Sequence, residues 1–208
     1  MPTTAHSRRS ASHRKGDAAE QAILETAERL LQAAPLSDVS VEAIARGAGI
    51  SRSSFYFYFA SKEDVLLALV DQATAWLEER VAAATATVAE DPQRGIADGI
   101  EATALLWREH AGVLRAAIAT AATDERVRAA WDAMLRRFVD LNAAMIRAER
   151  DRGGAAGEAA PEELATALVL LSERSFYAAA AGGDVALAGD RIVPVLTEVW
   201  QRAIFGRG

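Results

Sequence analysis

The sequence predicts an all-α protein of about nine helices, with an N-terminal three-helix domain followed by a larger helical bundle. Three observations support this prediction. Alanine is abundant and β-branched residues do not dominate, which favours helices. Apolar residues recur at three- and four-residue spacing through most of the chain. Ser, Asp, Pro and Gly stand where helices should begin and end, and no segment is predicted as a strand.

The N-terminal part of the chain is expected to hold three short helices and one long helix. In order, they cover residues 22–34, 41–49, 51–59 and 61–88. Pro35 stops the first helix because proline cannot continue it. A serine stands at the start of each of the other three helices and can cap it. These serines are Ser40, Ser51 and Ser61.

Five further helices are expected after residue 91. They cover residues 96–110, 112–120, 125–152, 161–181 and 190–205. Three starts are marked, by Asp91 followed by Pro92, by Asp124 and by Pro161. The last two helices carry more apolar surface than the rest of one subunit is expected to bury. We therefore expect them to form a four-helix, two-fold interface in a homodimer.

The charge of the chain is distributed unevenly. The formal net charge is −6, yet residues 1–62 carry eight basic and six acidic side chains, against fifteen and twenty-three in the remainder. Residues 1–18 are expected as a flexible basic arm that includes Arg8, Arg9, Arg14 and Lys15. The basic N-terminal end suggests an anionic partner. The simpler interpretation is that these charges are only solvated and bind no partner. The arm either adds phosphate contacts to DNA or is an inert tail.

Several classes of protein are disfavoured by what the sequence lacks. There is no cysteine, so disulfides and thiolate metal sites are excluded. No secretory signal or transmembrane span is recognised. Neither HExxH, G-x-S-x-G, a P-loop nor a cluster of metal ligands is found. We therefore expect a cytoplasmic protein with no membrane association, no catalytic residue, no metal site and no cofactor.

One stretch, GISRSSFYFYFASKED at residues 49–64, contains five consecutive aromatic residues. Such a run is typical of a β-strand. On a helix, however, residues three and four apart share a face, so Phe55 and Phe59 lie together on one side. Arg52 and Tyr56 share another side. The stretch is therefore interpreted as a helix with an inner aromatic face and an outer polar-aromatic face.

The residues around this helix fit a helix-turn-helix that binds DNA. Ala45 is small where two helices cross, Gly49 stands where a tight turn needs positive φ, and Phe55 follows Ala45 by ten residues. A helical hairpin used only for packing would not need the exposed polar and aromatic side chains that follow Gly49 in this sequence. Hydroxyls allow close approach, arginine offers two donors to guanine, and tyrosine and lysine reach phosphates. These exposed residues are Ser51, Arg52, Ser53, Ser54 and Tyr56, followed by Lys62.

Residues 22–70 resemble the N-terminal domain of the TetR family of transcriptional regulators, in its ethionamide-resistance-repressor branch. A weaker likeness continues through AERDRG at 148–153, ELATAL at 163–168 and SER at 172–174. The resemblance implies an all-α homodimer that binds a palindromic operator in double-stranded DNA, with a helix-turn-helix domain at 19–66 and a ligand-binding and dimerisation domain at 67–208. It places recognition contacts on Arg52, Ser53, Tyr56 and Phe57, with Tyr58 and Lys62 near phosphates and Ser54 fixing the helix start.

The resemblance also implies a small hydrophobic effector inside the C-terminal bundle. Taken alone, the aromatic residues of this region would be core. By the resemblance, the effector pocket is lined by Trp107, Trp131, Leu135, Phe138, Asn142, Val169, Ser172, Glu173, Tyr177 and Trp200. Asn142, Ser172 and Glu173 are its candidate polar handles. For Glu173 we expect first a structural ion pair and second a ligand contact.

The function implied is a repressor that leaves its operator when the effector binds. The helix from residue 61 to 88 joins the two domains, so we expect it to transmit the change. An activator of the same family, a protein-interaction bundle that no longer binds DNA, and an all-α enzyme are the alternatives. The operator sequence and the effector do not follow from the sequence, since this branch carries asparagines where Val169 and Ser172 stand.

Overall fold

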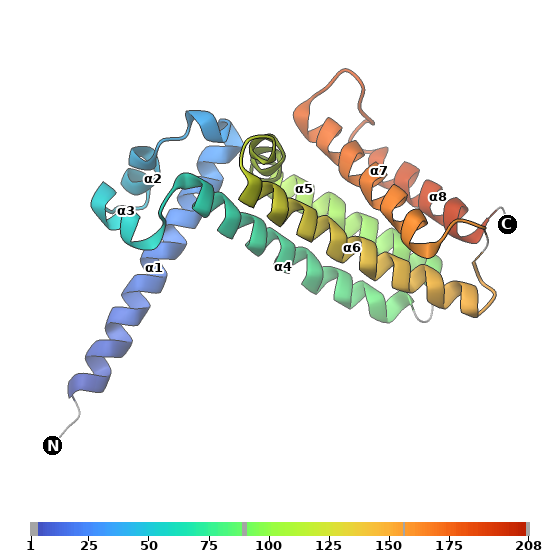
Figure 1. Cartoon of the computed structure of the whole chain (residues 1–208), viewed down its shortest axis with the longest axis horizontal. Helices are drawn as coiled ribbons and strands as arrows, with labels where there is room; N and C mark the ends of the chain where they lie inside the picture. The colour runs from blue at the N-terminus through green and yellow to red at the C-terminus, as the bar shows by residue number, and fades with distance from the viewer. Residues whose placement is uncertain (1–3, 89–90, 156, 207–208) are drawn as a thin grey trace.

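The computed structural model describes residues 4–88, 91–155 and 157–206, and gives side-chain surroundings for those from residue 16 onward except 82–88. The described elements are eight α-helices and one short 3-10 helix, which confirms the all-α prediction (Figure 1). They are α1 (Thr4–Ala33), η1 (Leu36–Asp38), α2 (Val41–Gly47), α3 (Arg52–Tyr58), α4 (Lys62–Val88), α5 (Pro92–Ala121), α6 (Glu125–Asp151), α7 (Pro161–Ala181) and α8 (Ile192–Phe205).

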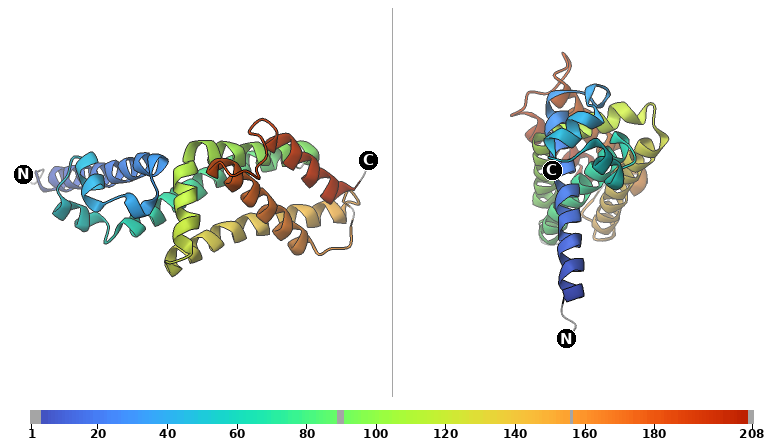
Figure 2. Two further views of the ribbon diagram at one scale, coloured as in Figure 1. Left: turned by 90° about the horizontal axis from the view of Figure 1, so that it is seen from above. Right: turned by 90° about the vertical axis from the view of Figure 1, so that its left-hand side faces the viewer.

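The molecule is elongated, with α1, α2 and α3 at one end and the bundle of α5 to α8 at the other (Figure 2). Helix α4 leaves the small N-terminal domain and runs along the bundle, where it packs against α5 and α6. Helices α7 and α8 lie together on the outer side of the bundle. The helix from residue 61 to 88 therefore physically joins the two parts.

The helix-turn-helix is built from local signals. The Ser40 hydroxyl caps α2 by accepting the Ala43 N–H at 3.1 Å. Gly49 takes the positive φ of 71° that the turn requires. The Ser51 hydroxyl then caps α3 by accepting the Ser54 N–H at 3.0 Å. These caps fix where each helix begins, which is the property that a reading helix needs.

The core of the small domain holds α2 and α3 on α1. Phe55 and Ile44 are fully buried, together with Ala45 and Ile23. Gly47 lies so close to α1 that a methyl group there would meet the Thr26 side chain at 2.4 Å. The aromatic run is thus anchored by its inner face, as the helical interpretation predicted.

Helix α5 spans both helices that the sequence predicts over 96–110 and 112–120, and its bend at His110 lies where the first of them is expected to end. It is continuous from Pro92 to Ala121 but bends at His110, whose φ of −114° and ψ of 20° are not helical. The described residues accordingly hold eight α-helices rather than nine. The bend brings Gly112 onto the backbone of α1, where an added Cβ would lie 2.5 Å from the Leu31 carbonyl oxygen.

The basic arm expected to be flexible over residues 1–18 has helical backbone from Thr4 onward. The flexibility of this arm stays a prediction, and residues 1–3 lie outside the described part. No proline interrupts the chain between Thr4 and Ala34, and Gly16 is the only glycine there. Nothing in the sequence therefore ends α1 before Pro35.

Candidate nucleic-acid interface and cavity

Helix α3 presents its outer face to solvent. Tyr56 is 47% exposed and Phe57 is 84% exposed, whereas Phe55 on the opposite face is fully buried. The four preceding residues, Ser51, Arg52, Ser53 and Ser54, are exposed as well, and Tyr58 is half-buried. An 84% exposed phenylalanine is not explained by the core of this chain. The helix thus offers hydroxyl, guanidinium and aromatic groups to a partner.

The serines at the start of α3 form a small hydroxyl cluster. Ser51 Oγ lies 2.8 Å from Ser53 Oγ and 2.8 Å from Ser54 Oγ. The Ser54 hydroxyl thus contacts the capping residue of α3, and its role in fixing the helix start stays a prediction. Because these side chains are short, another surface can approach the helix backbone closely here.

Arg52 is held by two neighbours. Its guanidinium forms an ion pair with Glu42 on α2, and it donates a hydrogen bond of 3.3 Å to the Tyr56 hydroxyl. The guanidinium carbon also lies 5.7 Å from the centre of the Tyr56 ring. The hydrogen bond to Tyr56, and then the charge of Glu42, raise the pKa of Arg52 above its usual value. The group is therefore charged at any physiological pH.

Lys62 has a role that the sequence did not predict. Its ammonium group donates to the backbone carbonyls of Leu36 at 2.6 Å, Val39 at 3.0 Å and Ser37 at 3.3 Å. An ammonium has three N–H donors, so these three contacts can use all of them. In this arrangement Lys62 ties the start of α4 to η1 and the connection after it. The phosphate contact expected of Lys62 stays a prediction.

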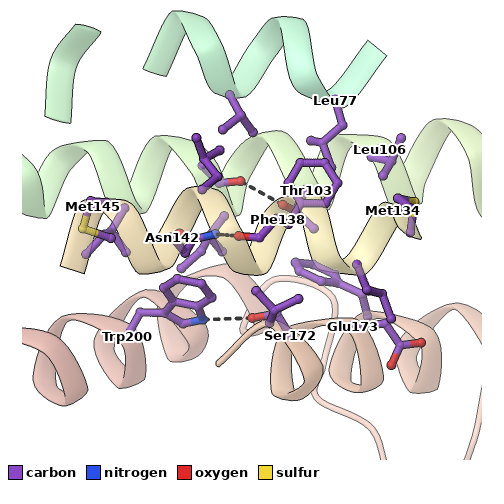
Figure 3. A pocket seen from close by; sticks show the side chains of 18 of the residues that line it. Leu77, Thr103, Leu106, Met134, Phe138, Asn142, Met145, Ser172, Glu173 and Trp200 are labelled. Carbon is purple, nitrogen blue, oxygen red and sulfur yellow. Dashed lines mark hydrogen bonds between the residues drawn. The ribbon is translucent and has the colours of Figure 1, made fainter. Parts of the chain in front are cut away.

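A cavity of about 360 Å³ lies inside the bundle. Of the ten residues predicted to line an effector pocket, nine line this cavity, on α5, α6, α7 and α8 (Figure 3). They are Trp107, Trp131, Leu135, Phe138, Asn142, Val169, Ser172, Glu173 and Trp200. The volume falls in the range of small-molecule pockets, roughly 300–1,000 Å³. Its walls are largely apolar, as a site for a hydrophobic molecule requires.

Tyr177 does not line this cavity. Phe176 takes that place, with its ring stacked on Trp107 at 6.5 Å, while Tyr177 meets the edge of Trp107 at 6.4 Å. Tyr177 instead borders a second groove between the domains, which Lys62 and Arg115 also line. The two residues are adjacent on α7 and so point about 100° apart, which sequence spacing alone did not resolve.

Sequence reasoning missed most of the wall that α4 and α5 supply. The additional lining residues include Leu77 and Val81 on α4, Ile96, Ile100, Thr103 and Leu106 on α5, Met134 and Met145 on α6, and Arg152 after it. The apolar spacing of α5 was visible in the sequence. Which of its apolar residues face a cavity rather than a neighbouring helix depends on the direction of the bend at His110. The sequence predicted a helix end at residue 110 but not the direction in which the chain turns there.

Three polar side chains of the cavity wall are donors in hydrogen bonds within the protein. Trp200 Nε1 donates to Ser172 Oγ at 2.9 Å, and Asn142 Nδ2 donates to the Phe138 carbonyl at 2.8 Å (Figure 3). Thr103 Oγ1 donates to the Gly99 carbonyl at 2.9 Å. These contacts satisfy donors that would otherwise be costly to bury.

Glu173 and Arg174 do not form the structural ion pair that was expected first. Arg174 is exposed and its guanidinium lies over the Tyr177 ring at 5.0 Å. Glu173 lines the cavity edge, and its carboxyl group points away from the bond between Ser172 and Trp200 (Figure 3). Partial burial raises the pKa of Glu173, against the smaller opposing effect of the Arg174 charge. Adjacent residues on a helix diverge, which explains the missing pair.

The bend of α5 forms a junction with the small N-terminal domain. His110 Nδ1 lies 2.5 Å from Glu28 Oε1 on α1, and Gln32 Nε2 donates to the Glu109 carbonyl at 3.0 Å. The Trp76 ring of α4 meets the edge of His110 at 5.7 Å. Leu106, Trp107 and Leu114, which flank the bend, line the cavity. The cavity wall and the small N-terminal domain therefore meet at the bend of α5.

The part of the chain that the structure describes lacks two other kinds of site. No group of three or more His, Cys, Asp or Glu side chains there is arranged to hold a metal ion. None of the described helices combines the length and the apolar character that crossing a bilayer would demand.

Comparison with known families matches both parts of the chain. Residues 23–69 match the model described as bacterial regulatory proteins, tetR family. Residues 96–206 match the model described as transcriptional regulator EthR, C-terminal domain. The first match covers the helix-turn-helix and the second covers the bundle with the cavity.

Individual proteins give the same result. The chain is 38% identical over 203 residues to the HTH-type transcriptional regulator EthR of Mycolicibacterium smegmatis, covering 98% of this chain and 93% of that protein. It is 40% identical over 196 residues to EthR of Mycobacterium tuberculosis, covering 92% and 89%. A protein from Saccharomonospora viridis, solved with choline, has a TM-score of 0.79 at 24% identity, covering 91% and 98%, which shows a common fold.

Proposed function

Because this chain belongs to the TetR family of DNA-binding transcriptional regulators, we propose that it is a repressor released from a palindromic operator by a small hydrophobic effector. The observation that carries the proposal is that one helix, α4, starts beside the exposed helix α3 and also lines the cavity through Leu77 and Val81. The family relationship disfavours the enzyme reading, since the relatives are named as regulators. A repressor of chromosomal genes acts in the cytoplasm.

Helix α3 is the element proposed to enter the major groove. Its N-terminal residues would meet base edges, which is how recognition helices of this kind dock. The exposed faces of Tyr56 and Phe57 and the hydroxyl cluster at Ser51 support this orientation. Retention of these groups on the surface argues against a bundle that no longer binds DNA, because such a bundle would not need them.

The cavity is the proposed effector site, and Ser172 is its best polar handle. An indole N–H can only donate, so Ser172 Oγ accepts from Trp200 and its own hydroxyl hydrogen remains to be donated. Other helical hydroxyls of this chain, including those of Thr103 and Ser175, donate to the carbonyl four residues earlier. Ser172, which is 8% exposed, makes no such contact. These observations support an apolar ligand that carries a hydrogen-bond acceptor.

Release from DNA would follow from linkage between the two sites. An effector can weaken operator binding only by its different affinity for the two states of the protein. Two routes connect the sites, namely α4 itself and the junction of His110 with Glu28. An effector that moves α5 at Leu106 or Leu114 would shift α1 and hence α3. Operator and effector should therefore weaken each other's binding by the same factor.

A homodimer through α7 and α8 completes the proposal. These helices expose the large apolar side chains of Leu170, Leu171 and Val199, at 47%, 43% and 38%. Burying them against a second copy would remove apolar surface from water. The dimer would place two copies of α3 about 34–36 Å apart, the spacing of successive major grooves on one face of DNA.

The test begins with selection of bound DNA from random sequence by the purified protein. A palindromic sequence bound at one dimer per site is the expected result. Transcription from a promoter that carries the selected sequence then distinguishes repression from activation. Apolar compounds with a carbonyl group are screened for release of the complex, with Ser172→Ala as the matched variant. Selection that yields no sequence, even at low salt, would refute the operator function.

A further inference from the structure

One feature of the DNA-facing surface is not explained by the contacts proposed so far. Glu42, an exposed acid in the first turn of α2, pairs with Arg52 at the start of α3. The two side chains are 51% and 60% exposed, so the pair lies on the surface rather than in the core. Arg52 also donates to the Tyr56 hydroxyl at 3.3 Å. The three side chains form a chain across both helices of the helix-turn-helix.

The direction of these hydrogen bonds defines what the surface offers. A guanidinium group only donates, so the Tyr56 oxygen accepts from Arg52 and keeps its own O–H for an external acceptor. Glu42 is bound by Nη1 of Arg52 and Tyr56 by Nη2, so each of these nitrogens retains a second N–H. Together, Arg52 and Tyr56 present donors in one fixed arrangement. Guanine offers two acceptors, N7 and O6, on its major-groove edge.

Glu42 also opposes binding to DNA in general. A carboxylate near DNA is repelled by the phosphates, which dominate sequence-independent affinity. While Glu42 is paired with Arg52, it also cancels the attraction of that cation for any nearby phosphate. Lys62, another cation of this region, directs its ammonium group to backbone carbonyls. The recognition surface is therefore less attractive to arbitrary DNA than its arginine would suggest.

We propose that Glu42 is a specificity-determining positioning residue, which holds Arg52 and Tyr56 in the orientation that reads a guanine and weakens binding to other DNA. This inference rests on the proposed operator binding by α3. It differs from a direct contact because Glu42 acts through Arg52. Removing the negative charge of Glu42 is expected to have two opposite effects. Affinity for non-specific DNA should increase, whereas discrimination between the operator and other DNA should decrease.

The experiment compares Glu42→Gln with the wild type on the selected operator and on scrambled DNA of the same length, over a range of salt concentrations. We expect Glu42→Gln to bind scrambled DNA several-fold more tightly, with a salt dependence steeper by about one ion, because Arg52 becomes free to meet a phosphate. We expect no such gain on the operator. The ratio of the two affinities should then fall by about tenfold, the effect of one bidentate base contact.

A matched control separates position from net charge. Glu25 on α1 is exposed in the same domain, and its carboxylate accepts a hydrogen bond from Gln21 at 3.1 Å. Glu25→Gln should change both affinities by a similar factor and leave their ratio unchanged. Tyr56→Phe, which keeps the ring, should lower discrimination at the same base pair as Glu42→Gln.

Three results would overturn the assignment. The first is a ratio of operator affinity to scrambled-DNA affinity that differs by less than twofold between Glu42→Gln and Glu25→Gln, while the wild type still binds its operator. The proposed function would then stand without this inference. The second is a loss of discrimination by Glu42→Gln that persists in an Arg52→Ala background, because the effect would not pass through Arg52. The third is failure of the wild type to select any sequence, which would refute the operator function as well.

Discussion

The close packing of Gly112 against α1 gives a quantitative prediction. A Cβ added at Gly112 on α5 would lie 2.5 Å from the Leu31 carbonyl oxygen and 2.6 Å from the Gln32 nitrogen. Both are backbone atoms of α1, so no side-chain rotation relieves the clash. Gly112→Ala gains about 1 kcal/mol of helix propensity but incurs an overpacking cost of roughly 1–3 kcal/mol. We expect α1 to be displaced and operator affinity to fall.

Gly99 on the same helix supplies the matched control, because an added Cβ there meets nothing within 4 Å. Gly99→Ala should therefore only gain helix propensity and raise the Tm by about 2–4 °C, since roughly 1 kcal/mol shifts the Tm by that amount in a chain of this size. Gly112→Ala should lower the Tm or leave it unchanged. Calorimetry and operator titration of both variants measure this. If Gly112→Ala behaves like Gly99→Ala in both assays, the junction is not as closely packed as described.

Three further predictions concern the bundle. Ser172→Ala should lower the free energy of unfolding by about 1–3 kcal/mol, because it leaves the buried N–H of Trp200 without an acceptor; an unchanged denaturation midpoint would contradict this. Burial raises the pKa of Glu173, so the folded protein keeps the carboxyl proton at pH values above 4.5, where the unfolded chain has lost it. The free energy of unfolding should therefore fall as the pH rises from 4.5 through the raised pKa of the folded state. Unfolding of Glu173→Gln at several pH values should lack this decline, and an identical pH profile would be the contrary result. Leu170→Glu should yield monomers in sedimentation and weaken operator binding, whereas an intact dimer would place the interface elsewhere.

Much of the fold could be predicted from the sequence because its signals are local. Capping by Ser40, Ser51, Asp91 and Asp124 acts over two or three residues, and in each case the side chain accepts a backbone N–H as expected. The inner face of the aromatic run follows from helical spacing alone, and Phe55 is fully buried. Such features need no knowledge of the rest of the chain.

The features that sequence reasoning missed depend on distant partners. Glu28 and His110 are 82 residues apart, and Lys62 reaches carbonyls 23 to 26 residues earlier. Nothing near these residues in the sequence marks those contacts. Likewise, the exchange of Tyr177 for Phe176 in the cavity wall depends on how α7 is rotated. Trp107 on α5 and most of the predicted lining residues on α6, α7 and α8 came from the family resemblance, whereas the residues of α4 and the rest of α5 required the structure.

The central claim, that α3 reads DNA, is tested most directly by a footprint of the purified protein on the selected operator, with Tyr56→Ala in parallel. Tyr56 is 47% exposed, so its removal should spare the fold. We expect two protected half-sites about 10–10.5 base pairs apart or at a multiple of that spacing, and we expect both to be lost in the variant. Protection by Tyr56→Ala equal to that by the wild type, at the same protein concentration and salt, would contradict the assignment of α3 as the reading helix.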